Sequence, residues 1–216
     1  MARMKLRKLE EYLQGVDGFE KPKILLEQYP TPSHIASCML FDIQSKYDDL
    51  ENKLVADLGS GSGMLSIGAF LLGAQFTVGF ELDSDAIEIF RNNVADMELP
   101  AIDCVQCDVI RDLTIDSWDN VFDTVVMNPP FGTKHNAGMD MRFLESAVRL
   151  SNQSIYSLHK TSTRDYISKK TKEWSVTGEV VAKLRYNIDS LYKFHKKSSV
   201  DIEVDFWKFD SSNKNI

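Results

Sequence analysis

The first fifty or so residues carry hydrophobic positions at helical spacing. Leu6, Leu9 and Leu13 recur at intervals of three and four, which predicts an amphipathic helix in the opening segment. A second helix is predicted over residues 31–50, with Thr31 placed to cap its first turn. Residues 1–50 are therefore expected to form a helical extension ahead of the rest of the chain.

From residue 54 onward, short runs of β-branched and apolar residues alternate with stretches of helical spacing. This alternation is typical of a mostly parallel β-sheet covered by helices on both faces. The strands are predicted at 54–59, 76–83, 101–109, 122–130, 153–160, 176–188 and 200–209. The helices between them are predicted at 63–74, 83–97, 139–151 and 161–174. Only a dozen or so polar residues join the last two strands, so we expect an antiparallel pair at one edge of the sheet.

Length and composition favour one α/β domain over residues 1–210, followed by a disordered polar tail over residues 211–216. No apolar run approaches the ~20 residues that span a bilayer, so we expect an intracellular protein. The three cysteines do not suggest a disulfide framework. Cys104 and Cys107 form a C-x-x-C without a second ligand pair, so we interpret them as part of a strand and expect no metal.

The net charge of −7 argues against a nucleic-acid ligand, but the charge is unevenly distributed. Residues 1–150 carry 13 basic and 24 acidic side chains, and residues 151–216 carry 12 and 8. The basic residues could form a patch on an acidic body, or they could simply solvate helix faces and a loop. The candidate patch comprises Lys160, Arg164, Lys169, Lys170, Lys172, Lys193, Lys196 and Lys197.

A glycine-rich loop, "VADLGSGSGML", follows the first predicted strand and opens a helix. Gly59, Gly61 and Gly63 allow a sharp turn and a close approach of a ligand to the main-chain N–H groups. The dinucleotide fingerprint G-x-G-x-x-G is not met, because Met64 stands where the third glycine should be. Asp57, just ahead of the loop, suits a ligand with a cationic end such as an amino-acid ammonium.

Two more carboxylates are predicted at strand ends, where the ligands of parallel sheets bind. Glu81 can accept the hydroxyls of a ribose, and Asp108 can accept from the exocyclic amine of an adenine. With Asp57, these groups match the polar features of S-adenosylmethionine. Each carboxylate alone would also be explained as a helix cap or a turn residue.

The fourth strand ends in "VVMNPPFGTKHNAGMD", which contains the tetrapeptide Asn128–Phe131. An exocyclic amine is a poor nucleophile because its lone pair is delocalised into the ring. The side-chain carbonyl of Asn128 and the main-chain carbonyl of Pro129 could accept its two N–H bonds and localise that lone pair. Pro129 and Pro130 have fixed φ and no competing N–H, and Phe131 offers a stacking face contributing ~1–3 kcal/mol to a flipped base.

The motifs "DLGSGSG", "GFELD", "QCDV" and "NPPFG", in this order and spacing, resemble those of class I S-adenosylmethionine-dependent methyltransferases that modify amino groups. With "LLEQYPTPSHIA", "SIYSLHK" and "YKFHKKSSVDIEVD", the resemblance to the methyltransferase-like 5 family covers nearly the whole chain. It implies a Rossmann-like fold, a seven-stranded mostly parallel sheet with an antiparallel C-terminal hairpin and helices on both faces. It also implies methylation of N6 of an adenosine in small-subunit ribosomal RNA.

The motifs and the resemblance together imply both sites of the enzyme. The catalytic residues are expected to be Asn128, Pro129, Pro130 and Phe131. The S-adenosylmethionine site is expected to comprise Gln28, Thr31, Asp57, Gly59, Gly61, Ser62, Gly63, Met64, Glu81, Leu82, Asp108, Val109 and Asn128. RNA contacts are expected from Lys134, Lys160, Arg164, Lys193, His195, Lys196 and Lys197. The chain departs from the family pattern at Ser60 and Ser62, where cysteines are common, and at Glu81, where aspartate is usual.

The resemblance also implies a heterodimer with a small zinc-containing methyltransferase-activator subunit. The predicted strand at 101–109 should lie at the sheet edge, and an uncharged edge strand tends to pair with another chain. We expect Ile102, Cys104 and Val105, in the stretch from Ile102 to Cys107, to meet this partner. An edge blunted by Asp103 and Asp108 is the alternative. The protein is expected in the nucleus (nucleolus) and the cytoplasm.

Three other functions fit parts of the sequence. Asn-Pro-Pro-Phe is also used by guanine-N2 methyltransferases, while enzymes that methylate a protein glutamine amide usually have Tyr in place of Phe131. A catalytically dead binding module is disfavoured by the intact Asn128 and carboxylates. A nicotinamide dehydrogenase is disfavoured by the missing third glycine.

Overall fold

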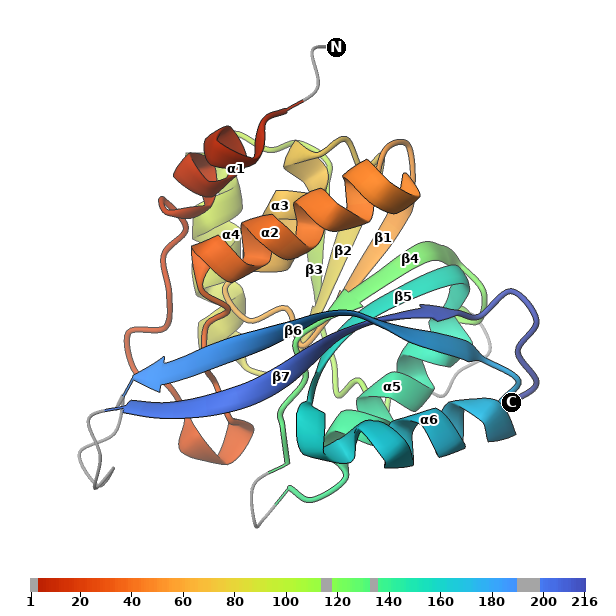
Figure 1. Cartoon of the computed structure of the whole chain (residues 1–216). Coiled ribbons are helices and arrows are strands. Elements are labelled where there is room, and N and C mark those ends of the chain that lie inside the picture. The colour runs from red at the N-terminus through yellow and green to blue at the C-terminus, as the bar shows by residue number, and fades with distance from the viewer. Residues whose placement is uncertain (1–3, 114–117, 133–135, 190–198) are drawn as a thin grey trace.

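The computed structural model describes residues 4–113, 118–132, 136–189 and 199–216. A single sheet runs through the molecule with the strand order β3-β2-β1-β4-β5-β7-β6, which confirms the seven predicted strands (Figure 1). The strands are β1 Leu54–Leu58, β2 Phe76–Glu81, β3 Ile102–Gln106, β4 Phe122–Met127, β5 Ser151–Lys160, β6 Thr177–Asp189 and β7 Ser199–Asp210.

Strands β1 to β5 are parallel, and β7 pairs antiparallel with both β5 and β6. The predicted antiparallel pair at the edge is confirmed. Because parallel strands all end on the same side of a sheet, the carboxyl ends of β1 to β4 meet along one edge. The predicted acidic and Asn-Pro-Pro-Phe motifs all lie there.

The helices form two layers (Figure 1). Around the described strands lie α1 Leu6–Leu13, α2 Ser33–Asp42, α3 Met64–Leu71, α4 Ser84–Asp96, α5 Met139–Leu150 and α6 Arg164–Glu173. Short helical turns occur at η1 Ile24–Leu26, η2 Ile43–Tyr47 and η4 Thr161–Thr163. Helices α1 to α3 share one apolar cluster with inward residues of β1, β4, β5 and β7, while α5 and α6 share a second cluster on the opposite face. Helix α4 packs on β2 and β3 beside α3.

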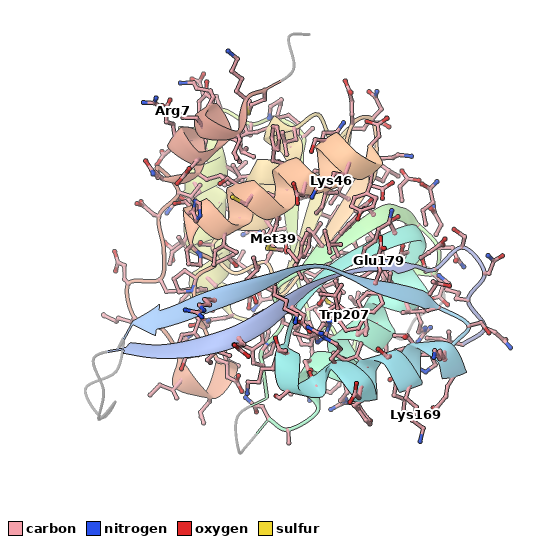
Figure 2. All side chains as sticks on the ribbon, in the orientation of Figure 1. Arg7, Met39, Lys46, Lys169, Glu179 and Trp207 are labelled. Atoms are coloured by element: carbon pink, nitrogen blue, oxygen red, sulfur yellow. The ribbon has the colours of Figure 1, made fainter. Side chains whose placement is uncertain are left out.

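The N-terminal extension is part of the core and not an appendage. Leu9 and Leu13 of α1 and Leu40 of α2 are fully buried in the same cluster as strand residues. A Cβ added at Gly68 of α3 would lie 2.3 Å from Leu40 Cδ1, so α2 and α3 are in close contact at this point. Figure 2 shows Met39 pointing from α2 toward the sheet, whereas Arg7 and Lys169 point outward.

Two predictions are wrong, one about the start of α2 and one about the C-terminal end of the chain. Helix α2 begins at Ser33 after Pro32 and has no side-chain cap, so Thr31 does not cap it. The segment after β7 is not a disordered tail. Ser211 is buried, its main-chain N donates to Gln153 O at 2.9 Å and its hydroxyl lies within hydrogen-bond distance of Ser151 O, while Asn215 N donates to Trp174 O at 2.9 Å. These polar residues order the tail because they pair with main-chain groups of β5 and of the turn after α6.

Strand β3 lies at the sheet edge as predicted. It is shorter than predicted, and the predicted orientation of the Cys104 side chain is wrong. Cys104 is buried beneath Ile87 and Phe90 of α4, so it faces a helix of its own chain and not a partner. Ile102 and Val105 are half-buried and Asp103 is exposed. The described residues contain no group of three or more His, Cys, Asp or Glu side chains placed to hold a metal ion. Within the same residues, no helix is long and apolar enough to cross a membrane.

We expect Leu40→Ala to lower the free energy of unfolding by about 2–5 kcal/mol, because the truncation leaves a cavity where α2 meets α1 and α3. Urea unfolding followed by circular dichroism measures the change. Leu25→Ala is the matched control, since Leu25 is 76% exposed and its truncation should change the value by less than about 0.5 kcal/mol. Equal effects of the two substitutions would contradict a structural role of the extension.

Candidate functional site

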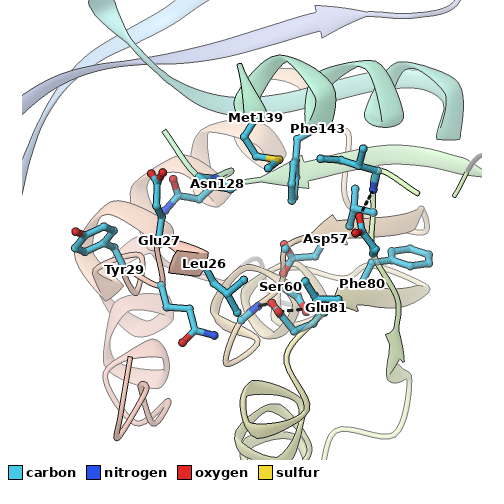
Figure 3. A pocket seen from close by; sticks show the side chains of 18 of the residues that line it. Leu26, Glu27, Tyr29, Asp57, Ser60, Phe80, Glu81, Asn128, Met139 and Phe143 are labelled. Carbon is cyan, nitrogen blue, oxygen red and sulfur yellow. Dashed lines mark hydrogen bonds between the residues drawn. The ribbon is translucent and has the colours of Figure 1, made fainter. Parts of the chain in front are cut away.

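A cavity of about 410 Å³ lies beyond the carboxyl ends of the parallel strands (Figure 3). Its wall comes from the glycine loop, the ends of β2 and β4, the segment after β3, the start of α5 and the stretch before α2. The predicted site residues in this wall are Gln28, Thr31, Asp57, Gly59, Gly61, Ser62, Met64, Glu81, Leu82, Asp108, Val109, Asn128 and Pro130. Gly63, Pro129 and Phe131 do not line it.

The glycine loop depends on conformations that other residues rarely adopt. Gly59, Gly61 and Gly63 have φ of +70°, +54° and +92°. A Cβ at Gly61 would lie 2.9 Å from Phe19 Cζ, so the loop packs directly against the N-terminal stretch. A Cβ at Gly63 would lie 2.8 Å from Phe90 of α4. Gly63 therefore serves the packing of α3 on α4, which explains why it does not line the cavity.

Asp57, the next-to-last residue of β1, is a buried carboxylate that is only 1% exposed. Its Oδ2 accepts from the main-chain N and the hydroxyl of Ser66, at 2.9 and 2.7 Å. Burial raises the pKa of Asp57 to about 7, against the two hydrogen bonds from Ser66, and the nearby charge of Glu81 adds to the increase. A cationic group in the cavity would favour the ionised form of this carboxylate.

Glu81 connects the loop after β1 with the turn after β2. Its Oε2 accepts from Gly61 N at 2.9 Å, and its Oε1 accepts from the main-chain N atoms of Leu82 and Asp83 at 2.8 and 2.9 Å. Burial raises the pKa of Glu81 above its ordinary value, and these main-chain bonds partly offset the rise. A carboxylate offers about four acceptor sites, so these three bonds leave Oε2 able to accept one more hydrogen bond from a ligand.

Sequence reasoning missed Asp83, which attaches the N-terminal stretch to this edge of the sheet. It caps α4, accepts from Gln28 Nε2 at 2.7 Å and forms an ion pair with Lys23. Burial would raise the pKa of Asp83, but the hydrogen bonds from Lys23 and Gln28 bring it below its ordinary value. Gln28 Oε1 in turn accepts from Lys23 N at 2.7 Å. In the sequence, Asp83 stands at the start of a predicted helix. It could therefore be predicted as a helix cap, but not as the partner of Gln28 and Lys23.

Asp108 lies in the segment after β3 and is bound to its own turn. It accepts from Ile110 N at 2.9 Å and from Arg111 Nε at 2.6 Å. Burial would raise the pKa of Asp108, but the Arg111 guanidinium holds it below its usual range. Arg111 also lines the cavity and was not predicted. The pair presents one anionic and one cationic group at this side of the wall.

Asn128 follows β4, and its amide is oriented by Thr31, 97 residues earlier in the chain. Asn128 Nδ2 donates to Thr31 Oγ1 at 2.9 Å. Since Nδ2 is the donor in this bond, Oδ1 is the atom of the amide that can accept from a ligand. Pro129 behind it is buried, so the chain has little room to shift at this point. Phe131 is half-buried and packs against the cluster that holds α1 to α3.

The N-terminal stretch also contacts the start of α5. Asn136 Nδ2 donates to Leu25 O at 3.0 Å and to Glu27 Oε1 at 3.1 Å. Glu27 adopts φ +50° and lies beside Asn128 in Figure 3, with Met139 and Phe143 forming the wall above. Leu25, Glu27, Asn136, Met139 and Phe143 were not predicted, because no local pattern marks a contact between segments more than a hundred residues apart.

Most of the predicted RNA-binding residues lie in the parts of the chain that the structure does not describe. Lys134, Lys193, His195, Lys196 and Lys197 lie outside the described residues. Lys160 is half-exposed at the end of β5. Arg164 forms a two-pronged ion pair with the fully buried Asp205, through Nε at 2.7 Å and Nη2 at 2.6 Å. Arg164 therefore joins α6 to β7, and its role in RNA binding stays a prediction.

The chain matches the family model described as "Conserved hypothetical protein 95" over residues 27–191. It is 70% identical to the rRNA N(6)-adenosine-methyltransferase Mettl5 of Drosophila melanogaster, covering 97% of this chain and 98% of that protein. It is 61% identical to METTL5 of Danio rerio, an rRNA N(6)-adenosine-methyltransferase, over 95% and 99% of the two chains. Among solved structures, PH1948 of Pyrococcus horikoshii, a protein of proposed RNA-methyltransferase activity, superposes with a TM-score of 0.81 at 32% identity, covering 96% of each chain.

The raised pKa of Asp57 predicts a pH-dependent stability. In the folded protein the carboxyl keeps its proton up to about pH 7, whereas in the unfolded chain it ionises near the ordinary aspartate pKa of 3.8. Its contribution to stability is thus complete below about pH 4 and is lost as the pH rises through 7. We expect the free energy of unfolding of the wild type to fall across this range relative to Asp57→Asn, measured by urea unfolding at pH 4.5 to 8. Parallel curves for the two proteins would contradict the raised pKa.

Proposed function

The chain belongs to the METTL5 family of rRNA N(6)-adenosine-methyltransferases, and from this premise we propose that it transfers a methyl group from S-adenosylmethionine to N6 of an adenosine in small-subunit ribosomal RNA. The observation that carries the proposal is one cavity whose wall holds both the strand-end carboxylates and Asn128. A cofactor and a planar amine can therefore meet in a single site.

The residues of the cavity fit S-adenosylmethionine. The buried carboxylate of Asp57 suits an ammonium group, the remaining acceptor site of Glu81 suits a ribose hydroxyl, and Asp108 suits an adenine amine. Gly59 and Gly61 allow close contact with the main chain of the loop. When bound, the cofactor supplies an electrophilic methyl group on a sulfonium. Gln28, Ser62, Met64, Leu82 and Val109 would complete its binding site.

The Asn-Pro-Pro-Phe element would prepare the acceptor amine. Asn128 Oδ1, oriented by the bond from Nδ2 to Thr31, accepts one N–H of the amine, and Pro129 O accepts the other. Both bonds draw electron density to the nitrogen and direct its lone pair. Because the nitrogen becomes cationic before it loses its proton, no strong base is needed, and most of the acceleration comes from positioning. The adenine is flipped out of the RNA to reach the cavity, with Phe131, which lies next to the wall at Pro130 and not in it, as the proposed stacking face.

RNA contacts outside the cavity are proposed for the basic C-terminal part. Lys160 lies at the carboxyl end of β5, next to the strand that carries Asn128. Lys134, Lys193, His195, Lys196 and Lys197 complete the proposed phosphate contacts, with the remaining edge of the Arg164 guanidinium as a further one. An enzyme with this substrate works where ribosomes are assembled and used, so we propose the nucleolus and the cytoplasm as its locations.

The activity is tested by incubating the protein, purified as the complex with the activator subunit proposed below, with labelled S-adenosylmethionine and separated ribosomal subunits, then digesting the RNA to nucleosides. We expect N6-methyladenosine in small-subunit RNA. Asn128→Ala should lower kcat ~10²-fold or more, because an oriented acceptor at the reacting nitrogen is lost.

The matched control is Asn152→Ala, at the opposite end of β5 from the cavity, which should retain wild-type turnover. Label in N2-methylguanosine or in protein would favour the other planar-amine substrates over adenosine. Unchanged N6-methyladenosine formation by Asn128→Ala would refute the assigned role of the tetrapeptide.

We also propose that a small zinc-containing activator subunit binds at β3. This strand is an edge of the sheet, and a cavity of about 340 Å³, lined by apolar residues together with Arg91, Glu98 and Asp103, lies between it and the end of α4. Val94, Leu99 and Ile102 are among its lining residues. An extended segment added to β3 would cover both the strand edge and this cavity.

The isolated chain is expected to be poorly soluble, and co-expression with the activator should yield a 1:1 complex. Hydrogen exchange of the complex should protect the amides of residues 102–106, while β6 at the other edge of the sheet serves as the internal control. A stable monomer at high concentration, or protection confined to β6, would contradict this interface.

A further inference from the structure

Three polar side chains beside the catalytic strand are buried and have no part in the proposed chemistry. His159 and Ser157 on β5 are 0% exposed, and Asp140 on α5 is 7% exposed. His159 Nε2 lies 2.9 Å from Ser157 Oγ, and His159 Nδ1 lies 3.2 Å from Asp140 Oδ2. Burying polar groups is costly unless their hydrogen bonds are made, so this chain of contacts must be well formed in the folded protein.

The direction of the bonds follows from the carboxylate. An ionised carboxylate only accepts, so Nδ1 carries the hydrogen toward Asp140, and Nε2 can accept the hydroxyl of Ser157. The order of the three residues is that of a hydrolase triad. Ser157 Oγ, however, is enclosed between the sheet and α5, where no substrate can reach it. These contacts therefore hold α5 against β5 and do not carry out a reaction.

The position of His159 relative to the catalytic element is set by the sheet register. Met127 of β4 pairs with Ser157 of β5, so continuing the parallel register by two residues places Pro129 level with His159. Asp140 is the second residue of α5, directly after the connection that leaves Phe131. Strand β5 thus holds the chain on both sides of residues 128–139, at Met127 by strand pairing and at Asp140 through the imidazole.

We propose that His159, through Asp140, is a positioning residue that sets the geometry of the Asn-Pro-Pro-Phe element; this inference rests on the proposed function. The contact anchors the first turn of α5, and with it Met139 and Phe143, which form the wall of the cavity facing Asn128 (Figure 3). Losing the contact leaves the cofactor ligands on β1 and β2 in place but lets the segment after Asn128 shift.

The test uses the full-length protein with His159→Leu and Asp140→Leu, each of which removes the bond between β5 and α5. We expect kcat for RNA methylation to fall ~10- to 100-fold, as a small misplacement of catalytic groups can produce. The Kd for S-adenosylmethionine, measured by calorimetry, should stay within about twofold of the wild type. Asp140→Asn keeps an oxygen that accepts from Nδ1–H, so it should retain most of the turnover.

Tyr156→Phe is the matched control. Tyr156 neighbours Ser157 on β5 but points to the opposite face, where its hydroxyl donates to Asp49 at 2.6 Å. Its removal also deletes a hydrogen bond from this strand, yet kcat should not change. A merely structural role for His159 would predict equal effects on turnover from His159→Leu and Tyr156→Phe at equal loss of Tm.

Hydrogen exchange tests the contact independently of turnover. The amides of residues 128, 131, 132 and 136–142 should exchange at least about tenfold faster in His159→Leu than in Tyr156→Phe, while those of β1 and β2 stay protected. Unchanged exchange in these residues, or a kcat within twofold of the wild type, would overturn the positioning role. If the wild type itself methylates no RNA, the proposed function fails, and the exchange measurement still decides whether His159 anchors the segment.

Discussion

The buried carboxylate of Glu81 holds together the part of the protein on which the cofactor site depends. Its two oxygens accept main-chain N–H groups from the glycine loop after β1 and from the turn after β2. Gly59 N and Ser60 N of the loop donate to the main-chain oxygen of Phe80 on β2, and the buried N–H of Gly61 is satisfied by the Glu81 carboxylate. With these bonds made, the loop stays open toward the cavity and α3 and α4 begin at defined positions.

The N-terminal stretch is held over the cavity by polar contacts at two places, Asp83 and Asn128. Gln28 and Lys23 bind Asp83 at the start of α4, and Thr31 binds Asn128 after β4. The extension is anchored separately by its apolar helices in the core. The cofactor side and the acceptor side of the cavity are thus covered by one segment, which couples the order of both to the packing of α1 and α2.

Thr31 is a residue whose chemistry is predicted correctly from the sequence but whose hydrogen-bond partner is not. Thr31 has the side chain of a helix cap, and a local reading assigns it that role. In the structure Pro32 precedes the helix instead, and the Thr31 hydroxyl oxygen accepts from an amide 97 residues away. Arg164, predicted as a phosphate ligand, also forms an ion pair with the buried Asp205, a contact that the sequence did not reveal. The chemistry of a side chain is known from the sequence, but the tertiary structure decides which group that side chain contacts.

The sequence alone determined the seven strands, the layers of helices, the strand ends that carry Asp57, Glu81, Asp108 and Asn128, and the family resemblance. These features are local, since hydrophobic period, glycine conformation and proline rigidity act within a few residues. Only the tertiary structure decided that Asp83 attaches the N-terminal stretch, that Cys104 is buried and that His159 meets Asp140. Such contacts join segments far apart in the chain, and no short-range pattern records them, because they arise when the sheet brings its strand ends to one edge and the helices close over it.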